Sequence, residues 1–140
     1  MINPNQNNLI KMTIPTDSSN ISLVRMTASS IANRIGFNIE EIDDVKIAIS
    51  EACTNVIKHS KVPAFELFVG QGNDFIEIEI KDSGVGYNFA DLKEPEFLGE
   101  RGNSGLGIFI IKMLMDEVVI NSKVDQGTSI YMKKQMESEV

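Results

Sequence analysis

From Ile10 onward every second residue near the start of the chain is apolar, which predicts a strand over residues 9–14. Pro15 follows directly, and we expect it to end the strand because proline has no N–H to donate to a sheet. Residues 1–8, which precede this strand, are mostly polar, so we expect them to form a flexible start.

Apolar residues then recur every three or four positions, which predicts two helices. The first covers Ile21 to Ile35, and Gly36 supplies the residue that commonly ends a helix. Asn38 then stands at the N-cap of a second helix, with Glu41 three residues later in the capping-box position. This helix is predicted to run to about Ser60, close to the next proline.

The second half of the chain is rich in strand patterns. The predicted elements are strands at residues 64–69 and 75–81, a loop or lid at 87–101, a helix at 108–115, and a final hairpin of strands at 118–122 and 128–133. Residues 75–81 alternate strictly, so one face of this strand should be buried and the other solvated. Hairpins with helices among them predict an α+β fold: a two-layer sandwich whose mixed or mostly antiparallel sheet is covered on one face by helices.

A chain of 140 residues predicts a single domain, which we place at residues 9–134 with a polar tail at 135–140. The net charge of −7 argues against a nucleic-acid surface. The single cysteine, Cys53, lies on the apolar face of the second helix and is expected to be a small buried hydrophobe. The start of the chain does not resemble a signal peptide, and no apolar run is long enough for a membrane span, so we expect a cytoplasmic protein.

The second helix carries a polar row beside its apolar face. Glu51, Asn55 and His59 are spaced four residues apart and therefore lie nearly above one another. Such a row can be an ordinary solvated face, and His59 is best explained as a residue that packs at the helix end. Two glycine-bearing segments downstream, residues 82–86 and 102–107, make a second interpretation possible, because each also suits a nucleotide.

The first of these segments suits the base of a nucleotide. Asp82 ends a buried strand, where its carboxylate can accept a hydrogen bond from an adenine amine away from competing water. Gly84 and Gly86 permit close approach of the backbone to a ligand. The alternative is structural, since an Asp before glycine often opens a turn. A Rossmann fingerprint and a P-loop are both excluded by the order and spacing of the glycines.

The second segment suits phosphates. Gly105 and Gly107 lead into a helix, whose free N–H groups and dipole favour anions, although taken alone they could form a simple hinge. Asn55 offers Mg²⁺ a neutral oxygen. Glu51, one turn away, can take the proton of a hydroxyl that attacks the γ-phosphate.

In this order and at these distances, Glu51 with Asn55, Asp82 with Gly84 and Gly86, and Gly105 with Gly107 resemble three sequence boxes of the GHKL ATPase superfamily, which includes gyrase, Hsp90, histidine kinases and MutL. Within it, residues 47–55 and the short length resemble the bacterial anti-sigma factor serine kinases, with the anti-sigma-B kinases first and the sporulation anti-sigma-F kinases next. The resemblance extends from Ile10 to about Lys133. A histidine kinase is disfavoured because the residues before Glu51 leave no room for a phosphoacceptor helix pair.

The resemblance implies a GHKL fold that binds ATP and Mg²⁺, inhibits a sigma factor as a homodimer, and phosphorylates a serine of an anti-anti-sigma partner of the STAS type. It implies no direct contact with nucleic acid or membrane. The roles it implies are general base for Glu51, Mg²⁺ ligand for Asn55, adenine acceptor for Asp82, contacts to nucleotide or lid for Gly84, Gly86, Gly105, Leu106 and Gly107, an adenine contact for Thr128, a partner contact for Arg25 with Arg34 nearby, and a phosphate contact for Arg101.

Three functions remain open at this point. The first is a serine kinase that also sequesters a sigma factor, and the second is a nucleotide-dependent, partner-switching binding module without significant kinase activity. The third is an interaction domain without a nucleotide. Glu51 favours the kinase, because a protein that only binds needs no base one turn from a Mg²⁺ ligand.

Overall fold

The computed structural model describes residues 2–83, 104–123 and 127–137. Its elements are, in order, β1 (Ile10–Pro15), a 3₁₀ turn (Ser18–Asn20), α1 (Ile21–Ile35), α2 (Ile39–His59), β2 (Ala64–Gln71), β3 (Phe75–Asp82), α3 (Ser104–Leu114), β4 (Glu117–Lys123) and β5 (Gly127–Gln135). All of these strands and α-helices were predicted from the sequence, with boundaries that differ by a few residues.

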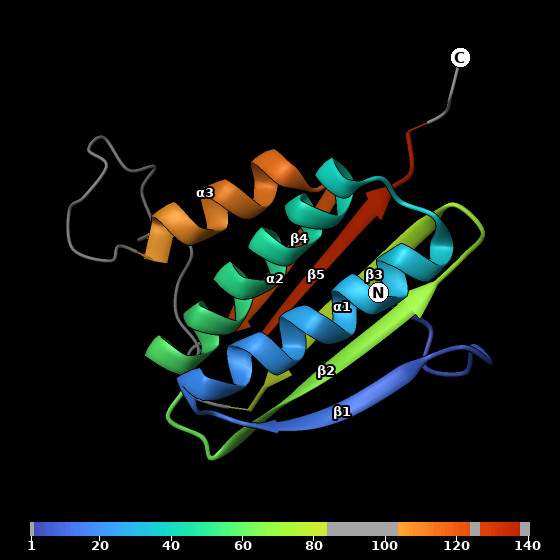
Figure 1. Ribbon diagram of the computed structural model, residues 1–140. Helices are drawn as coiled ribbons and strands as arrows, with labels where there is room; N and C mark the ends of the chain where they lie inside the picture. The colour runs from blue at the N-terminus through green and yellow to red at the C-terminus, as the bar shows by residue number, and fades with distance from the viewer. Residues whose placement is uncertain (1, 84–103, 124–126, 138–140) are drawn as a thin grey trace.

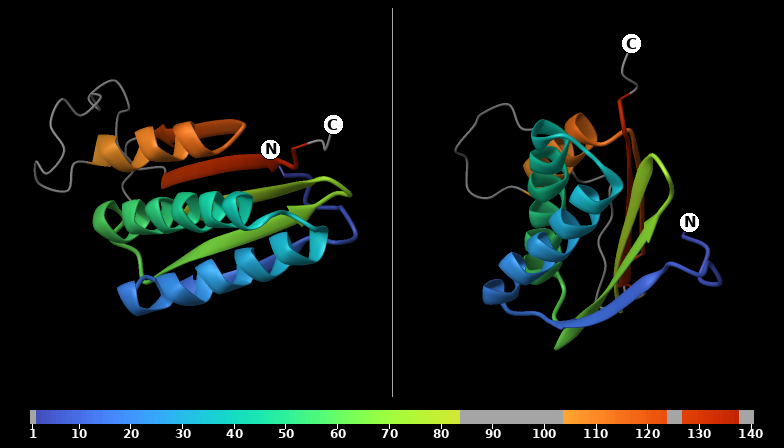
Figure 2. Two further views of the ribbon diagram at one scale, coloured as in Figure 1. Left: turned by 45° about the horizontal axis from the view of Figure 1, so that its top comes forward. Right: turned by 45° about the vertical axis from the view of Figure 1, so that its right-hand side comes forward.

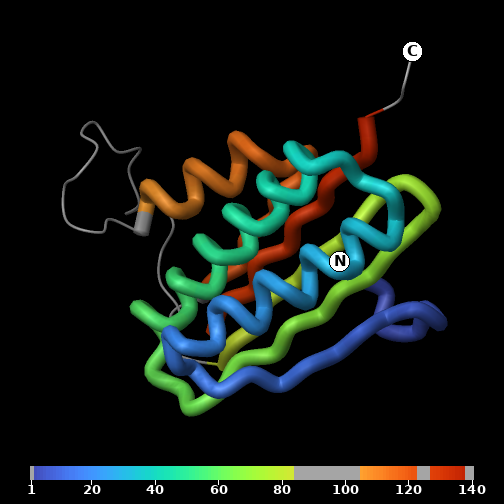
Figure 3. Tube along the Cα trace, in the orientation of Figure 1, coloured from blue at the N-terminus to red at the C-terminus, as the bar shows by residue number. Residues whose placement is uncertain are grey.

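The five strands form one sheet in the order β1-β2-β3-β5-β4, and every neighbouring pair is antiparallel. The three helices lie side by side on one face of this sheet (Figure 1). The tube in Figure 3 shows that β5 enters the sheet between β3 and β4, so the last strand of the chain is an interior one. The predicted α+β two-layer sandwich is confirmed, and the described sheet is antiparallel rather than mixed.

Local signals set the ends of the first two helices. The Asn38 side chain accepts a hydrogen bond from the Glu41 N–H at 2.8 Å, and the Asn38 N–H donates to Glu41 Oε1 at 2.9 Å, which completes the predicted capping box. Gly36 ends α1 in the left-handed conformation, at φ 109°.

The hydrophobic core fills the space between the helices and the sheet. Its largest fully buried side chains are aliphatic, with one methionine: Ile14, Ile49, Leu67, Ile76, Ile78, Ile80, Ile111, Ile130, Met132, Val24, Val45 and Val69. Cys53 belongs to this core, as predicted, and burial raises the pKa of its thiol to about 12.

The outer face of the sheet is less solvated than the alternation of β3 predicts. Glu79 is only 4% exposed: its carboxylate accepts hydrogen bonds from the Ser129 hydroxyl at 2.8 Å and from the Ile2 N–H at 3.4 Å. Ile2 is itself buried, and the start of the chain lies on the side of the sheet opposite the helices (Figure 2, right). The expectation of a fully wet face is therefore wrong at Glu79.

The start of α3 and the end of β5 differ from their predicted positions. The third helix begins at Ser104, four residues before the predicted start, so Gly105 and Gly107 lie inside its first turns. Gln135 belongs to β5 and its N–H donates to Asp116 Oδ2 at 2.7 Å, so this strand runs two residues beyond its predicted end.

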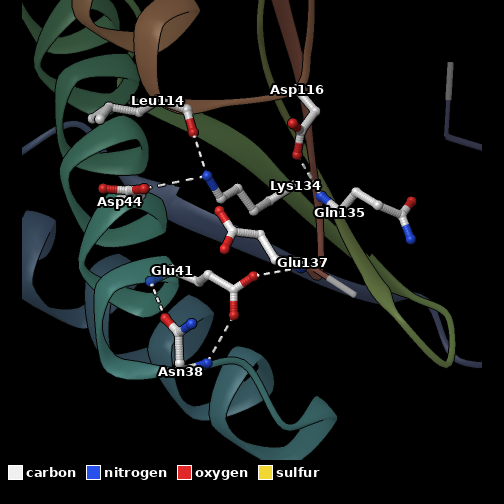
Figure 4. A network of polar contacts seen from close by, with 8 residues as sticks. All are labelled: Asn38, Glu41, Asp44, Leu114, Asp116, Lys134, Gln135 and Glu137. Carbon is white, nitrogen blue, oxygen red and sulfur yellow. Dashed lines mark hydrogen bonds and ion pairs between the residues drawn. The ribbon is translucent and has the colours of Figure 1, made fainter. Parts of the chain in front are cut away.

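A half-buried lysine joins three elements at the end of β5 (Figure 4). Lys134 Nζ lies 3.2 Å from Asp44 Oδ2 of α2 and donates to the Leu114 carbonyl of α3 at 2.8 Å. A cation at the C-terminus of a helix also complements the helix dipole. Lys134 therefore fastens the ends of α2 and α3 that lie away from Glu51 and Gly107.

Candidate nucleotide-binding site

Four elements converge at one end of the sandwich. The third strand ends there, β5 and α3 begin there, and the C-terminal half of α2 lies above them (Figures 1 and 2). Most of the residues singled out from the sequence lie on these four segments. Gly84, Gly86 and Arg101 lie outside the described residues, so their predicted roles remain predictions.

A polar row crosses the sheet at this end. Asp82 pairs with Thr128 of β5, and Thr128 pairs with Ser122 of β4. Strand residues alternate between faces, so Asp82 and Thr128 share the helix-facing side with Ile80 and Ile130, which are fully buried. The inner face of the sheet is therefore apolar in its middle rows and polar at this last row. The structure brings together Asp82 and Thr128, which are 46 positions apart in the sequence.

Gly127 makes this close pairing possible. It has φ 86°, a conformation that residues with a Cβ rarely adopt. A Cβ at this position would collide with the Asp82 carbonyl oxygen and would lie 2.9 Å from the Ser83 Cα. The chain therefore needs glycine where β5 first meets the end of β3.

The helical side of the site contains Glu51 and Asn55, one turn apart on α2. Glu51 is half-buried and Asn55 is 5% exposed. A Cβ built on Gly107 would lie 3.0 Å from Glu51 Oε2, so the first turns of α3 pass directly beside this carboxylate. The structure thus brings together the second glycine segment and the carboxylate predicted to act as a base.

Several other predicted residues have clear positions. Gly105 is buried, while Leu106 and Gly107 are half-buried at the start of α3. His59 is half-buried in the last turn of α2, and burial, with the charge of Lys58 as a smaller cause, lowers its pKa below 6.5. In the described part of the chain, no three or more His, Cys, Asp and Glu side chains come together as a metal site.

A groove of about 470 Å³ connects Glu51 with the surface of the helical layer. It lies between α1 and α2, and its lining combines both charges with one apolar side chain: Arg25, Asp43, Lys46, Ile47, Ser50 and Glu51. Arg25 was predicted to contact a partner, and the structure places it on the same groove as Glu51.

Ser122 was not predicted from the sequence as a residue of this site. Its hydroxyl oxygen lies 2.8 Å from that of Thr128. A signal was present, because Ser122 continues the alternation of Val118 and Ile120 as a polar residue at the end of an apolar face.

A model of the "Histidine kinase-like ATPase domain" matches residues 14–134. This chain belongs to the histidine kinase-like ATPase family. The resemblance to the GHKL superfamily is therefore confirmed. Within the described residues, no helix combines the length and apolarity needed to cross a bilayer.

One relative by sequence and two solved structures show in more detail what this chain is similar to. The serine-protein kinase RsbW of Bacillus mycoides strain KBAB4 is 36% identical to this chain, over 93% of this chain and 86% of the relative. The crystal structure of the RsbU and RsbW domains of Rv1364c from Mycobacterium tuberculosis has a TM-score of 0.70 at 16% identity, and the match covers 96% of this chain but only 34% of that longer one. The histidine kinase domain of Erythrobacter litoralis EL346 matches with a TM-score of 0.53 at 17% identity, over 88% of this chain and 62% of that one. These two structures support the fold, and the Bacillus relative supports the narrower resemblance to serine kinases.

Proposed function

We propose that this chain is an ATP-dependent serine-protein kinase that binds and inhibits a sigma factor and phosphorylates a serine of an anti-anti-sigma factor. The observation that carries the kinase proposal is the position of Glu51. Its carboxylate lies beside Gly107 of α3, one turn from Asn55, and on a groove that opens to the protein surface. A carboxylate that borders both a nucleotide site and a surface groove is suited to act as the base when a phosphoryl group passes from ATP to a protein substrate.

The nucleotide would lie at the polar end of the sandwich. The Asp82 carboxylate would accept a hydrogen bond from the amine of adenine, and Thr128 would lie beside it. The phosphates would approach the start of α3, where Gly107 carries no side chain and the positive end of the helix dipole favours anions. The oxygen of Asn55 would hold Mg²⁺, and the metal would offset the charge of the phosphates.

Glu51 would act as the general base for phosphoryl transfer. It would take the proton of the acceptor serine as the serine oxygen forms a bond to the γ-phosphorus. The bond between that phosphorus and the β–γ bridging oxygen would break, and ADP would leave. The groove beside Glu51 offers Arg25 and Lys46 as cations for acidic groups of a protein partner.

The proposal for protein partners is supported by the surface around Arg25 and by the similarity to serine-protein kinase RsbW. Three exposed apolar side chains, Leu23, Met26 and Ile47, lie on α1 and α2 in the region of Arg25. Such residues suit contacts with a sigma factor, with a STAS-type anti-anti-sigma factor, or with a second copy in a homodimer. We also propose a cytoplasmic location.

A nucleotide-dependent binding module without significant transfer is the second candidate. It would use the same adenine and phosphate contacts and the same partner surface. The contact between Glu51 and Gly107 favours the kinase, because binding alone does not require a carboxylate in this place.

The first experiment is calorimetry of ATP and Mg²⁺ with the wild type and with Asn55→Ala. We expect micromolar-range binding that collapses in the variant. The absence of ATP binding by the wild type would overturn the proposed function and leave a partner-binding domain.

The second experiment separates kinase from binding module. Glu51→Gln should retain ATP binding while phosphoryl transfer to the partner falls by about 10²-fold or more, the scale of general-base loss. Glu40→Gln, an exposed residue at the other end of the same helix, is the matched control and should keep wild-type transfer. Unchanged transfer in Glu51→Gln would remove Glu51 from the role of base.

A further inference from the structure

The outer face of the sheet carries a buried carboxylate that the proposed reaction does not use. Glu79 of β3 is 4% exposed, and its Oε2 accepts a hydrogen bond from the Ser129 hydroxyl of β5 at 2.8 Å. Its Oε1 accepts a longer bond from the Ile2 N–H at 3.4 Å. Among the residues that the structure describes, no lysine or arginine forms an ion pair with Glu79. Burying a carboxylate without a cation is costly, and an apolar pair would fill the same place at less cost, so Glu79 points to a role beyond stability.

The bond between Glu79 and Ser129 runs toward the nucleotide end of the sheet. Glu79 lies directly opposite Tyr131, and Ser129 is two residues earlier in β5, so the bond is diagonal. The row that follows Ser129 is the pair of Asp82 with Thr128. The bond therefore ties β5 to β3 one row before the two proposed adenine contacts.

That last row needs a tie. Asp82 and Thr128 form the final pair of β3 with β5, and the ends of strands fray most easily. Ser129 and Thr128 are neighbours whose side chains lie on opposite faces, so a bond that holds Ser129 from outside also holds the backbone that carries Thr128 inside. Ile2 is 7% exposed and covers Glu79 on the side away from the helices, so few waters compete for the bond (Figure 2, right).

We propose that Glu79 is a positioning residue for adenine. Through Ser129 it holds the start of β5 against the end of β3, which keeps Thr128 and Asp82 at the spacing that the base requires. This inference rests on the proposed ATP site, and Glu79 acts on it from the opposite face of the sheet without touching the nucleotide. It serves binding of the base and not the transfer step, because Glu51 lies on α2 in the helical layer.

A purely structural role would also explain the bond, since diagonal pairs stabilise sheets. The two roles differ in their readout. A structural role predicts a lower free energy of unfolding with unchanged ATP affinity. A positioning role predicts a higher KM for ATP with unchanged kcat, and rescue by a side chain that restores the hydroxyl.

The experiment compares Ser129→Thr with Ser129→Val, two variants of nearly the same shape that differ in the hydroxyl. Dissociation constants for ATP with Mg²⁺ are measured by calorimetry, and KM and kcat by transfer to the partner, after circular dichroism has established that each variant is folded. We expect Ser129→Thr to behave as the wild type. Ser129→Val should bind ATP about 3- to 10-fold more weakly, the scale of one hydrogen bond, with KM raised by a similar factor and kcat unchanged.

Two further comparisons make the result specific. Glu79→Met removes the acceptor and should weaken ATP binding to a similar extent, and Ser129→Val in that background should cause no further loss. An equal further loss would overturn the positioning role. Lys134→Met breaks contacts at the opposite end of the sandwich, so it should lower the free energy of unfolding and leave ATP affinity unchanged. A loss of ATP affinity in this control would show that any destabilisation weakens the site and would also overturn the role.

The outcomes separate this inference from the proposed function. A wild type that does not bind ATP overturns both. A wild type that binds ATP, with unchanged affinity in Ser129→Val, overturns only the role of Glu79. A wild type that binds ATP without transfer overturns the kinase, and the dissociation constants then decide on Glu79. If Glu79→Met does not fold, the two Ser129 variants decide alone.

Discussion

Gly107 of α3 lies against Glu51 of α2 so closely that a Cβ on the glycine would be 3.0 Å from Glu51 Oε2. The absence of a side chain at position 107 therefore leaves the carboxylate its observed place. The carboxylate is the flexible end of its side chain, so an added methyl group would displace it by a few tenths of an ångström without forcing the helices apart. A substitution at this contact should therefore change the rate of phosphoryl transfer without lowering the stability of the fold.

The substitution Gly107→Ala should lower phosphoryl transfer about 10-fold, because small displacements of a positioned base are costly. It should leave the free energy of unfolding unchanged or raise it by up to about 1 kcal/mol, since alanine favours helix over glycine. Urea unfolding and the transfer rate are the two measurements. In a Glu51→Gln background the same substitution should cause no further loss of transfer, and an additional 10-fold loss there would contradict the explanation.

Gly127→Ala should be strongly destabilising. The new Cβ meets the Asp82 carbonyl in a residue at φ 86°, so backbone strain and a collision add together. We expect a loss of about 3 kcal/mol in the free energy of unfolding. Gly36→Ala is the matched control at φ 109°, where the nearest atom is the flexible Met136 Cε at 3.7 Å, and it should cost only about 1 to 2 kcal/mol.

Urea unfolding of both glycine variants measures this difference. The collision in Gly127→Ala occurs where β5 meets the end of β3, beside the proposed adenine contact Asp82. ATP affinity should therefore also fall in Gly127→Ala and not in Gly36→Ala. Equal stabilities for the two variants would show that the Asp82 carbonyl moves aside easily.

Lys134 should contribute more to stability than a lysine in an exposed ion pair. Its side chain is 12% exposed and bonds both Asp44 and the Leu114 carbonyl, whereas Lys11 is 58% exposed in its pair with Glu66. We expect Lys134→Met to cost about 2 kcal/mol, because it leaves a carbonyl and a carboxylate without this donor. Lys11→Met should cost about 1 kcal/mol or less. Chemical denaturation of the two variants is the measurement, and equal costs would contradict the role of Lys134 as a fastener.

His59 should make stability depend on pH in the weakly acidic range. It is the one histidine of the chain, and burial followed by the charge of Lys58 lowers its pKa below 6.5. The folded state therefore binds this proton less tightly than the unfolded state. The stability from neutral His59 is fully present above pH 6.5 and is lost as the pH falls through the folded-state pKa.

Proton NMR of the single imidazole measures this pKa directly. Urea unfolding at pH 7.5 and 5.5 should give a smaller free energy at the lower pH, and part of that difference should vanish in His59→Asn. An imidazole that titrates at or above 6.5 would contradict the effect of burial.

Much of the fold was predictable because its signals are local. The bounds of α1 and the capping of α2 depend on Gly36, Asn38 and Glu41, each acting within a few residues of itself. The buried position of Cys53 follows from the period of one helix. Residue roles that depend on a ligand, such as those of Asn55 and Arg25, remain predictions.

Other features were not predictable because their causes lie far away in the chain. Glu79 alternates with buried isoleucines and therefore reads as solvated, yet Ile2 covers it from 77 positions away. The early start of α3 was hidden by the low helix propensity of Gly105 and Gly107, which tertiary packing against α2 outweighs. Ser122 carried only a weak signal until the register of β4 and β5 was known.

By itself, the sequence determined the strands, the helices and the chemistry available on each, since alternation, helical period and capping are decided by neighbours in the chain. The tertiary structure alone decided which of these groups meet. Antiparallel register sets Asp82, Thr128 and Ser122 in one row, and helix packing sets Gly107 against Glu51. The physical reason is that register and packing depend on burying whole apolar faces together, a condition that no single segment can satisfy.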